Sequence, residues 1–137
     1  AGTVMTMMTF RTPTPESCGI VEVDDDGVVS SFFEKPANPP GNLANGAVYL
    51  LEYDVLRWVA QRPDVTDFST QVIPEFLGRI ATWENTGIHR DIGVMQSLLE
   101  AQYDPLCDPC WSLHDTWTRT YKEYPVHGYL AEAMKSR

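Results

Sequence analysis

Three short segments of the chain carry side chains that could bind or react with a ligand. The first is the pair Glu34-Lys35, which precedes Pro36. A carboxylate accepts hydrogen bonds from hydroxyl groups, and an ammonium offers a point positive charge to a phosphate. The pair could therefore hold a polar, phosphorylated ligand from two sides. The alternative is a solvated strand end that leads into a proline turn.

The other two segments contain Asn45-Gly46 and Asp91. Asn45-Gly46 is typical of a turn, although a glycine that enters a strand also lets a ligand approach the backbone closely. Asp91 precedes a predicted helix, where an aspartate commonly serves as the cap. Its carboxylate could instead bind Mg²⁺, which is usually held by one or two carboxylates together with substrate phosphates.

The elements that must position these segments alternate between strands and helices, which indicates an α/β fold. Apolar and β-branched runs predict strands over 3–10, 19–23, 28–34, 47–51 and 80–84, and helical spacing predicts helices over 54–62, 70–77 and 95–102. We expect Asp24–Gly27 to form a hairpin turn with Gly27 at positive φ. We also expect Asp54 to cap the first helix, and Asp67 or Ser69 to cap the second, which Pro74 shortens or kinks.

The chain also carries six short motifs in a fixed order. They are Cys18-Gly19-Ile20-Val21-Glu22, Asp26-Gly27, Phe33-Glu34-Lys35-Pro36, the segment 42–51, Asp67-Phe68-Ser69 with Val72-Ile73-Pro74, and Arg90-Asp91-Ile92-Gly93. Each motif is weak alone, but together they resemble the sugar-phosphate nucleotidyltransferases. These enzymes include the mannose-1-phosphate and heptose-1-phosphate guanylyltransferases and the glucose-1-phosphate thymidylyltransferases. The resemblance covers about residues 4–103 and is closest to the bacterial guanylyltransferases.

The resemblance implies a partial Rossmann-like nucleotidyltransferase sheet with helices on its faces and an inserted β-hairpin. It implies transfer of a nucleotidyl group from a nucleoside triphosphate, expected to be GTP, to a sugar 1-phosphate. In the family reaction an oxygen of the sugar phosphate attacks the α-phosphate, and pyrophosphate leaves. Mg²⁺ and basic side chains neutralise the charge that develops, so catalysis is mostly positioning and electrostatics.

The resemblance also implies roles for individual residues. Lys35 and Asp91 are expected to be catalytic, and Asp91 is the expected Mg²⁺ ligand. Val94 departs from the family, which often has threonine at this place. The expected contacts to the sugar phosphate come from Gly19, Glu34, Lys35, Asn45 and Gly46.

The family's glycine-rich nucleotide-binding loop and its earlier metal-binding aspartate are not found in these 137 residues. We therefore expect 1–104 to be the C-terminal, sugar-phosphate-binding half of a nucleotidyltransferase domain. Residues 105–137 are expected to be a helical C-terminal extension with a break at 125–128. This interpretation leaves open whether the isolated chain is active. It also favours a homo-oligomer, because a half-sheet has unpaired edges and uncovered apolar faces.

Composition excludes several classes of protein. The net charge of -9 makes the chain a poor general binder of nucleic acid, whose backbone is also negative. No apolar run approaches the ~20 residues that a membrane-spanning helix needs. Three cysteines, an odd number, argue against a secreted disulfide framework and favour a reducing cytoplasm.

Two other functions stay open. A non-catalytic binding or regulatory module would keep the sugar-phosphate pocket and lack the nucleotide half. A zinc-stabilised interaction domain would use Cys107, Cys110 and His114, whose spacing and donor atoms suit zinc. Its fourth ligand would come from Cys18, His89 or His127.

Overall fold

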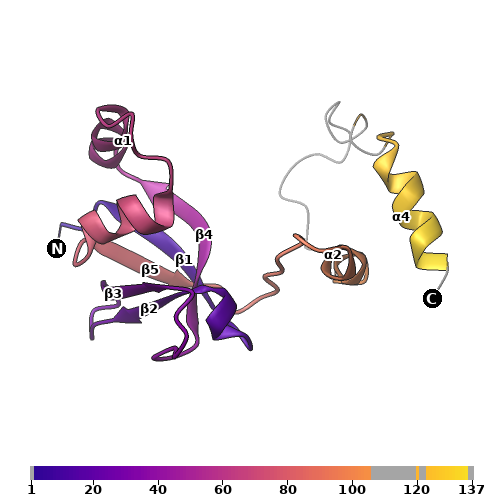
Figure 1. The fold of residues 1–137 in the computed structure, drawn as a ribbon, viewed down its shortest axis with the longest axis horizontal. Helices are drawn as coiled ribbons and strands as arrows, with labels where there is room; N and C mark the ends of the chain where they lie inside the picture. The colour runs from indigo at the N-terminus through magenta and orange to yellow at the C-terminus, as the bar shows by residue number, and fades with distance from the viewer. Residues whose placement is uncertain (1, 106–119, 121–122, 136–137) are drawn as a thin grey trace. The chain divides into compact units, whose positions relative to one another are not determined.

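The computed structural model describes residues 2–105, 120 and 123–135. The chain forms two compact units, Ala1–His89 and Arg90–Arg137. The first unit is a five-stranded mixed sheet with helical segments, so the predicted α/β class is confirmed (Figure 1). Its elements are β1 (Met5–Arg11), β2 (Gly19–Val23), β3 (Val29–Glu34), β4 (Leu43–Leu51), α1 (Tyr53–Ala60) and β5 (Ile80–Glu84). The second unit contains α2 (Met95–Ala101) and α4 (Val126–Lys135).

Strand β1 lies inside the sheet, whose order is β3-β2-β4-β1-β5. It pairs antiparallel with β4 and parallel with β5. Its side chains alternate between the two faces, so Met5, Met7 and Thr9 are buried on one face. The predicted strands over 19–23 and 80–84 coincide with β2 and β5.

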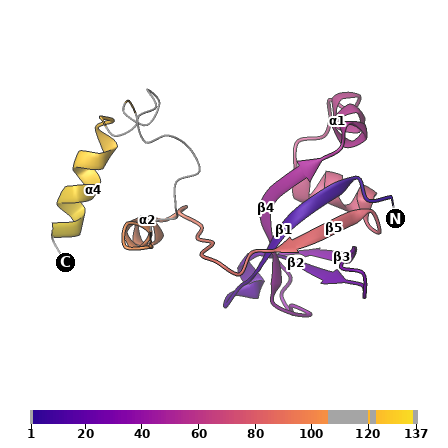
Figure 2. The same cartoon turned by 180° about the vertical axis from the view of Figure 1, so that it is seen from behind.

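The buried face of the sheet is covered by two short helical turns. A π-helical turn, Phe68–Val72, is followed directly by a 3-10 turn, Ile73–Phe76. Val72, Ile73 and Phe76 are buried in one cluster with residues of β1 and β5. Figure 2 shows the same segment from behind, on the far side of the strands. The core of this unit therefore lies between these turns and the sheet, and it also includes buried residues of the β2–β3 hairpin.

The β2–β3 hairpin curls back toward the other edge of the sheet. Gly27 has a φ of 75° in its turn, as the sequence predicts. Val28 forms an antiparallel bridge with Ala81 of β5, and the hydroxyl of Thr82 donates a hydrogen bond to the Gly27 carbonyl at 2.8 Å. The tip of the hairpin is therefore tied to β5, although β2 pairs with β4 only through Ile20 and Ala44.

The opposite face of the sheet is apolar and exposed. Thr6 and Met8 of β1, Val48 and Leu50 of β4, and Trp83 of β5 line a shallow hollow there. Leu50 is 73% exposed and Trp83 is 59% exposed. The helical turns therefore cover one apolar face of the sheet, whereas the apolar side chains of the other face are exposed.

The helices differ from the sequence expectation at their ends. Glu52, not Asp54, occupies the N-cap position of α1, and Asp54 lies in the first turn, where it pairs with Arg57 at 2.6 Å. A carboxylate in the first turn favours the helix through its dipole without capping it. Asp67 does cap the next segment, because its carboxylate accepts a hydrogen bond from the Thr70 backbone. In place of a single helix over 70–77, a separate 3-10 turn begins at Ile73, with Pro74 as its second residue.

The predicted turn at Asn45-Gly46 is wrong, because both residues lie inside β4. Asn45 pairs with Thr9, and directly after it three residues of β4, Gly46 to Val48, form a bulge opposite Met8 alone. Ala47 takes a φ of 56° there. Cross-strand pairing with β1 continues on both sides of the bulge, and it overrides the local turn preference.

The predicted helix break at 125–128 lies earlier in the chain, because 123–125 are in a turn and α4 runs from Val126 through Gly128. None of the helices in the described ranges is long and apolar enough to cross a membrane. The predicted division into a transferase part, 1–104, and an extension stays a prediction about function.

We predict that Gly46→Ala destabilises the chain by about 1–3 kcal/mol. An added Cβ would lie 2.5 Å from Met8 Cε and 3.1 Å from the Met8 carbonyl oxygen. The methionine methyl group can move, but the carbonyl belongs to the paired strand. Urea unfolding followed by circular dichroism measures the change. Gly41→Ala is the matched control, because a Cβ there meets nothing within 4 Å. Equal stability of the two variants would contradict the prediction.

Candidate functional site

Glu34 and Lys35 lie where β3 ends. Their side chains form an ion pair with 3.7 Å between Lys35 Nζ and Glu34 Oε1. Lys35 has a φ of 44°, a left-handed conformation that is uncommon for a residue with a side chain. Its backbone N–H donates to the Cys18 carbonyl at 3.1 Å, which holds this strained residue against the start of β2. Backbone strain of this kind is often found at functional sites.

Gly19 faces Glu34 across the hairpin, where the two residues are direct partners in the strand register. A Cβ on Gly19 would lie 2.7 Å from the Phe32 ring and 3.0 Å from Glu34 Oε2. The Phe32 ring and the Glu34 carboxylate therefore pack directly against the Gly19 backbone, which only a glycine allows. The predicted role of Gly19 in lining a sugar pocket stays a prediction.

Asn45 is joined to this region through Tyr49. The Asn45 amide nitrogen donates to the Tyr49 hydroxyl at 2.7 Å, and that hydroxyl lies 3.0 Å from the Asn45 carbonyl oxygen, to which it can donate. The same carbonyl oxygen accepts a hydrogen bond from the Ala47 backbone at 2.9 Å. The bulge thus lets Asn45 and Tyr49, four residues apart, contact each other on one face of β4.

Glu34 and Asn45, both predicted site residues, lie close enough to the Tyr49 phenol to change its pKa. Burial raises the pKa of the Tyr49 phenol above its ordinary value, and the nearby charges of Glu34 and Asp67 raise it further. Hydrogen bonds with Asn45 and Ser69 act in the opposite direction. The structure therefore groups the predicted residues Glu34 and Asn45 around one phenol.

Asp67 and Tyr49 also belong to this group, although neither is among the predicted site residues. Hydrogen bonds from the backbone and hydroxyl of Thr70 lower the pKa of the Asp67 carboxyl, and the charge of Lys35 lowers it as well. Phe68, the next residue, packs on Tyr49 with 4.5 Å between ring centroids. Asp67 and Tyr49 each lie in one of the six motifs that carry the family resemblance. Their place in those motifs is the signal that could have identified them.

The group has a donor set suited to a sugar phosphate. Two carboxylates and an amide can bind hydroxyl groups, and Lys35 can bind a phosphate. The nucleotidyl transferase family model matches residues 1–106 of this chain. The chain belongs to this family.

Relatives of the chain support the assignment at the family level. It is 36% identical over 123 residues to a glucose-1-phosphate adenylyltransferase of Thermomicrobium roseum, covering 79% of this chain and 28% of the relative. It is 31% identical over 128 residues to one of Clostridium botulinum (strain Alaska E43 / Type E3), covering 85% of this chain and 33% of the relative. A Clostridium beijerinckii enzyme of the same name is 29% identical over 143 residues, covering 95% of this chain and 37% of the relative. The chain thus spans about a third of the length of these relatives.

Gly46 has a packing role that is separate from its predicted contact to a sugar. Its Cα approaches Met8, whose side chain lies on the exposed apolar face of the sheet. Asn45 and Tyr49 extend toward the other face, on which Met7 and Thr9 are buried. The predicted contact of Gly46 with a sugar hydroxyl stays a prediction.

Asp91 lies in the second unit, in the segment that leads to α2. It does not cap the helix, because Val94 occupies the N-cap position. Its Oδ1 accepts a hydrogen bond from the Gly93 backbone at 2.8 Å, which closes a small Asx turn. Asp91 belongs to the second unit and Glu34 to the first, and the predicted role of Asp91 as a Mg²⁺ ligand stays a prediction.

The Asp91 carboxylate fits Mg²⁺ as a single ligand. It supplies the hard oxygen donors that Mg²⁺ prefers, and its Oδ1 is oriented by the Gly93 N–H. Within the described ranges, no group of three or more His, Cys, Asp or Glu side chains could hold a metal ion. Asp91 would therefore act with substrate phosphates rather than within a cage of protein ligands.

The zinc hypothesis rests on Cys107, Cys110 and His114, which lie outside the described residues. Of its proposed fourth ligands, Cys18 lies beside the Thr12 hydroxyl, with 3.7 Å between sulfur and oxygen. The His89 ring packs against Phe10 with 4.2 Å between ring centroids. His127 lies in α4.

We predict that the Tyr49→Phe variant lacks a tyrosine ionisation that the unsubstituted chain shows above the ordinary tyrosine pKa of about 10. Ultraviolet absorbance of tyrosinate during an alkaline titration measures it. Because the pKa of Tyr49 is raised in the folded chain, its stabilising effect is complete below pH about 10 and is lost as pH rises through the folded value. Tyr53→Phe, on the exposed surface of α1, should leave the late ionisation in place.

Proposed function

We propose that this chain provides the sugar-1-phosphate side of a nucleotidyl transfer reaction. The observation that carries the proposal is the ion pair of Glu34 with the strained Lys35, in one group with Asn45 and Tyr49. Lys35 would bind the phosphate, while Glu34 and Asn45 would accept or donate hydrogen bonds to sugar hydroxyls. Family membership supports the reaction class.

In the proposed reaction an oxygen of the sugar 1-phosphate forms a bond to the α-phosphorus of the nucleoside triphosphate. The bond between the α-phosphorus and the bridging oxygen breaks, and pyrophosphate leaves with that electron pair. Lys35 holds the attacking phosphate and offsets its charge, which is positioning and electrostatic catalysis. Mg²⁺, held by Asp91 and phosphate oxygens, would supply further neutralisation of charge.

The identity of the sugar and of the nucleotide is a finer part of the proposal. The sequence predicts GTP with mannose 1-phosphate or heptose 1-phosphate. The relatives are named glucose-1-phosphate adenylyltransferases, which favours glucose 1-phosphate and ATP as the first pair to test. Measuring pyrophosphate release with ATP and with GTP compares the two expectations directly.

We predict that Lys35→Ala weakens the binding of glucose 1-phosphate about tenfold to hundredfold. This follows from the roughly 1.5–3 kcal/mol of a hydrogen bond to a charged group, at about 1.4 kcal/mol per tenfold. Calorimetric titration of the whole chain with glucose 1-phosphate, and with free glucose as the reference, measures the loss. Mannose 1-phosphate and heptose 1-phosphate, titrated in the same way, test the sequence prediction.

Two further variants separate the charge of Lys35 from its backbone and from the net charge of the chain. Lys35→Gly relieves the left-handed strain and should bind as weakly as Lys35→Ala. Lys135→Ala removes the same charge from α4 and should bind like the unsubstituted chain. Binding that ignores the phosphate, or that survives both Lys35 substitutions, would show that the proposed site is wrong.

A further inference from the structure

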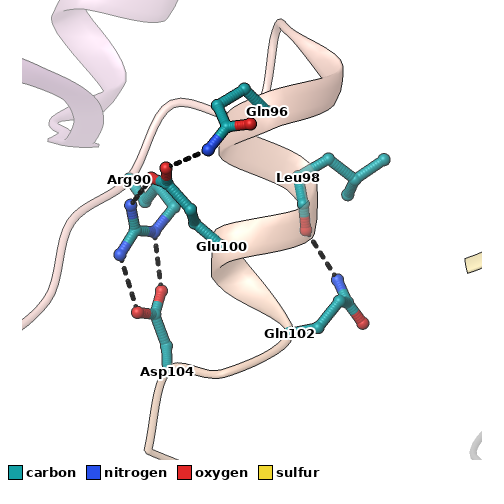
Figure 3. A network of polar contacts seen from close by, with 6 residues as sticks. All are labelled: Arg90, Gln96, Leu98, Glu100, Gln102 and Asp104. Atoms are coloured by element: carbon teal, nitrogen blue, oxygen red, sulfur yellow. Dashed lines mark hydrogen bonds and ion pairs between the residues drawn. The ribbon is translucent and has the colours of Figure 1, made fainter. Parts of the chain in front are cut away.

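Arg90, which precedes α2, forms ion pairs with a residue in the helix and with a residue that follows it. Two nitrogens of Arg90, Nε and Nη2, donate to the two carboxylate oxygens of Asp104 at 2.8 and 2.7 Å. Its Nη1 donates to Glu100 Oε2 at 2.9 Å. Glu100 is held in turn by the side chain of Gln96 (Figure 3). We call these contacts of Arg90, Glu100 and Asp104 the Arg90 clamp.

The clamp holds a helix that has little else to fix it locally. A helix of seven residues, such as α2, is too short to be stable in isolation. No side chain caps its N-terminus. Arg90 precedes the helix and Asp104 follows it, so the clamp joins the entry and the exit of the helix. The paired, planar geometry of the arginine fixes direction as well as distance, which a lysine cannot do.

Asp91 directly follows Arg90 of the clamp and is the first residue of the Asx turn. Its backbone follows Arg90, and its Oδ1 is held by the Gly93 N–H at 2.8 Å. The clamp anchors the chain before Asp91, and the turn orients the side chain after it. Arg90 and Asp91 are adjacent in the chain, and their side chains make different contacts, so an effect of the clamp on Asp91 would pass through the backbone.

We propose that Arg90 is a positioning residue for Asp91 and that the clamp sets the affinity of the Asp91 carboxylate for a divalent cation. The inference rests on the proposed function, because Asp91 is a metal ligand only there. Arg90 itself donates all of its described contacts to carboxylates of its own unit. Its role is thus to hold the ligand in place, not to contact the substrate.

The test measures cation binding by the whole chain with glucose 1-phosphate present and no nucleoside triphosphate, so that a phosphate is available and there is no turnover. Mn²⁺ is the probe, and paramagnetic broadening of the Asp91 and Gly93 amide signals reports its binding. We expect Arg90→Lys and Asp104→Asn each to require more Mn²⁺, by no more than the roughly tenfold to hundredfold that loss of a direct hydrogen-bond partner of a metal ligand costs. Exchange of the Gly93 amide with solvent should become faster in both variants. Asp104→Glu, which keeps the carboxylate, should recover much of the affinity.

The control variant disrupts another arginine–carboxylate ion pair, which lies in the first unit. Arg11 donates to both carboxylate oxygens of Glu84 at 3.1 and 3.2 Å, in the first unit. Arg11→Lys should leave Mn²⁺ broadening at Asp91 unchanged. Backbone chemical shifts show whether α2 still forms in each variant, so loss of the helix is separated from loss of positioning.

Two outcomes would overturn the inference. If Arg90→Lys and Asp104→Asn bind Mn²⁺ like the unsubstituted chain, the clamp only supports the helix, and the proposed function is untouched. If Mn²⁺ fails to broaden Asp91 in the unsubstituted chain while glucose 1-phosphate still binds, Asp91 is not a metal ligand. Arg90 then has nothing to position, although the sugar-phosphate site of the first unit stands.

Discussion

The pairing of β1 on both of its edges is the constraint on which the first unit depends. It joins β4 in one direction and β5 in the other, and these neighbours are separated along the chain by α1 and the helical turns. A parallel pair needs a long connection. In this chain the connection between β1 and β5 holds the hairpin, β4 and the helical turns that cover the core. Residues distant in sequence, such as Gly19, Glu34 and Tyr49, are thereby brought to one region.

The same region concentrates backbone strain. Lys35 and Ala47 are the two residues other than glycine that have positive φ in the described ranges. One stands in the candidate site, and the other in the bulge that lets Asn45 reach Tyr49. Left-handed conformation costs roughly 1–2 kcal/mol for such residues. The hydrogen bonds from the Lys35 and Ala47 backbones, to Cys18 and Asn45, offset part of this cost.

Local sequence signals predicted the parts that are determined locally. The strands over 19–23 and 80–84 follow from apolar runs bounded by turn residues, and the hairpin follows from Asp24–Gly27. The bulge could not be predicted in this way, because Asn45-Gly46 has the composition of a turn and only pairing with β1 keeps it in a strand. Tyr49 and Asp67 were missed for a related reason. Their place in the candidate site depends on contacts across the fold, whereas Glu34-Lys35 is visible as an adjacent pair.

The size of the bulge has a consequence for how this strand can change in evolution. Three residues of β4 oppose one residue of β1, an excess of two. Asn45 and Tyr49 lie on the same face because they pair with Thr9 and Met7, which share a face of β1. A bulge takes up extra residues locally, so a residue lost or gained between them would change the shape of the bulge while pairing with β1 continues on both sides. Insertions and deletions in this stretch should therefore disturb the contact between Asn45 and Tyr49 before they disturb the strand.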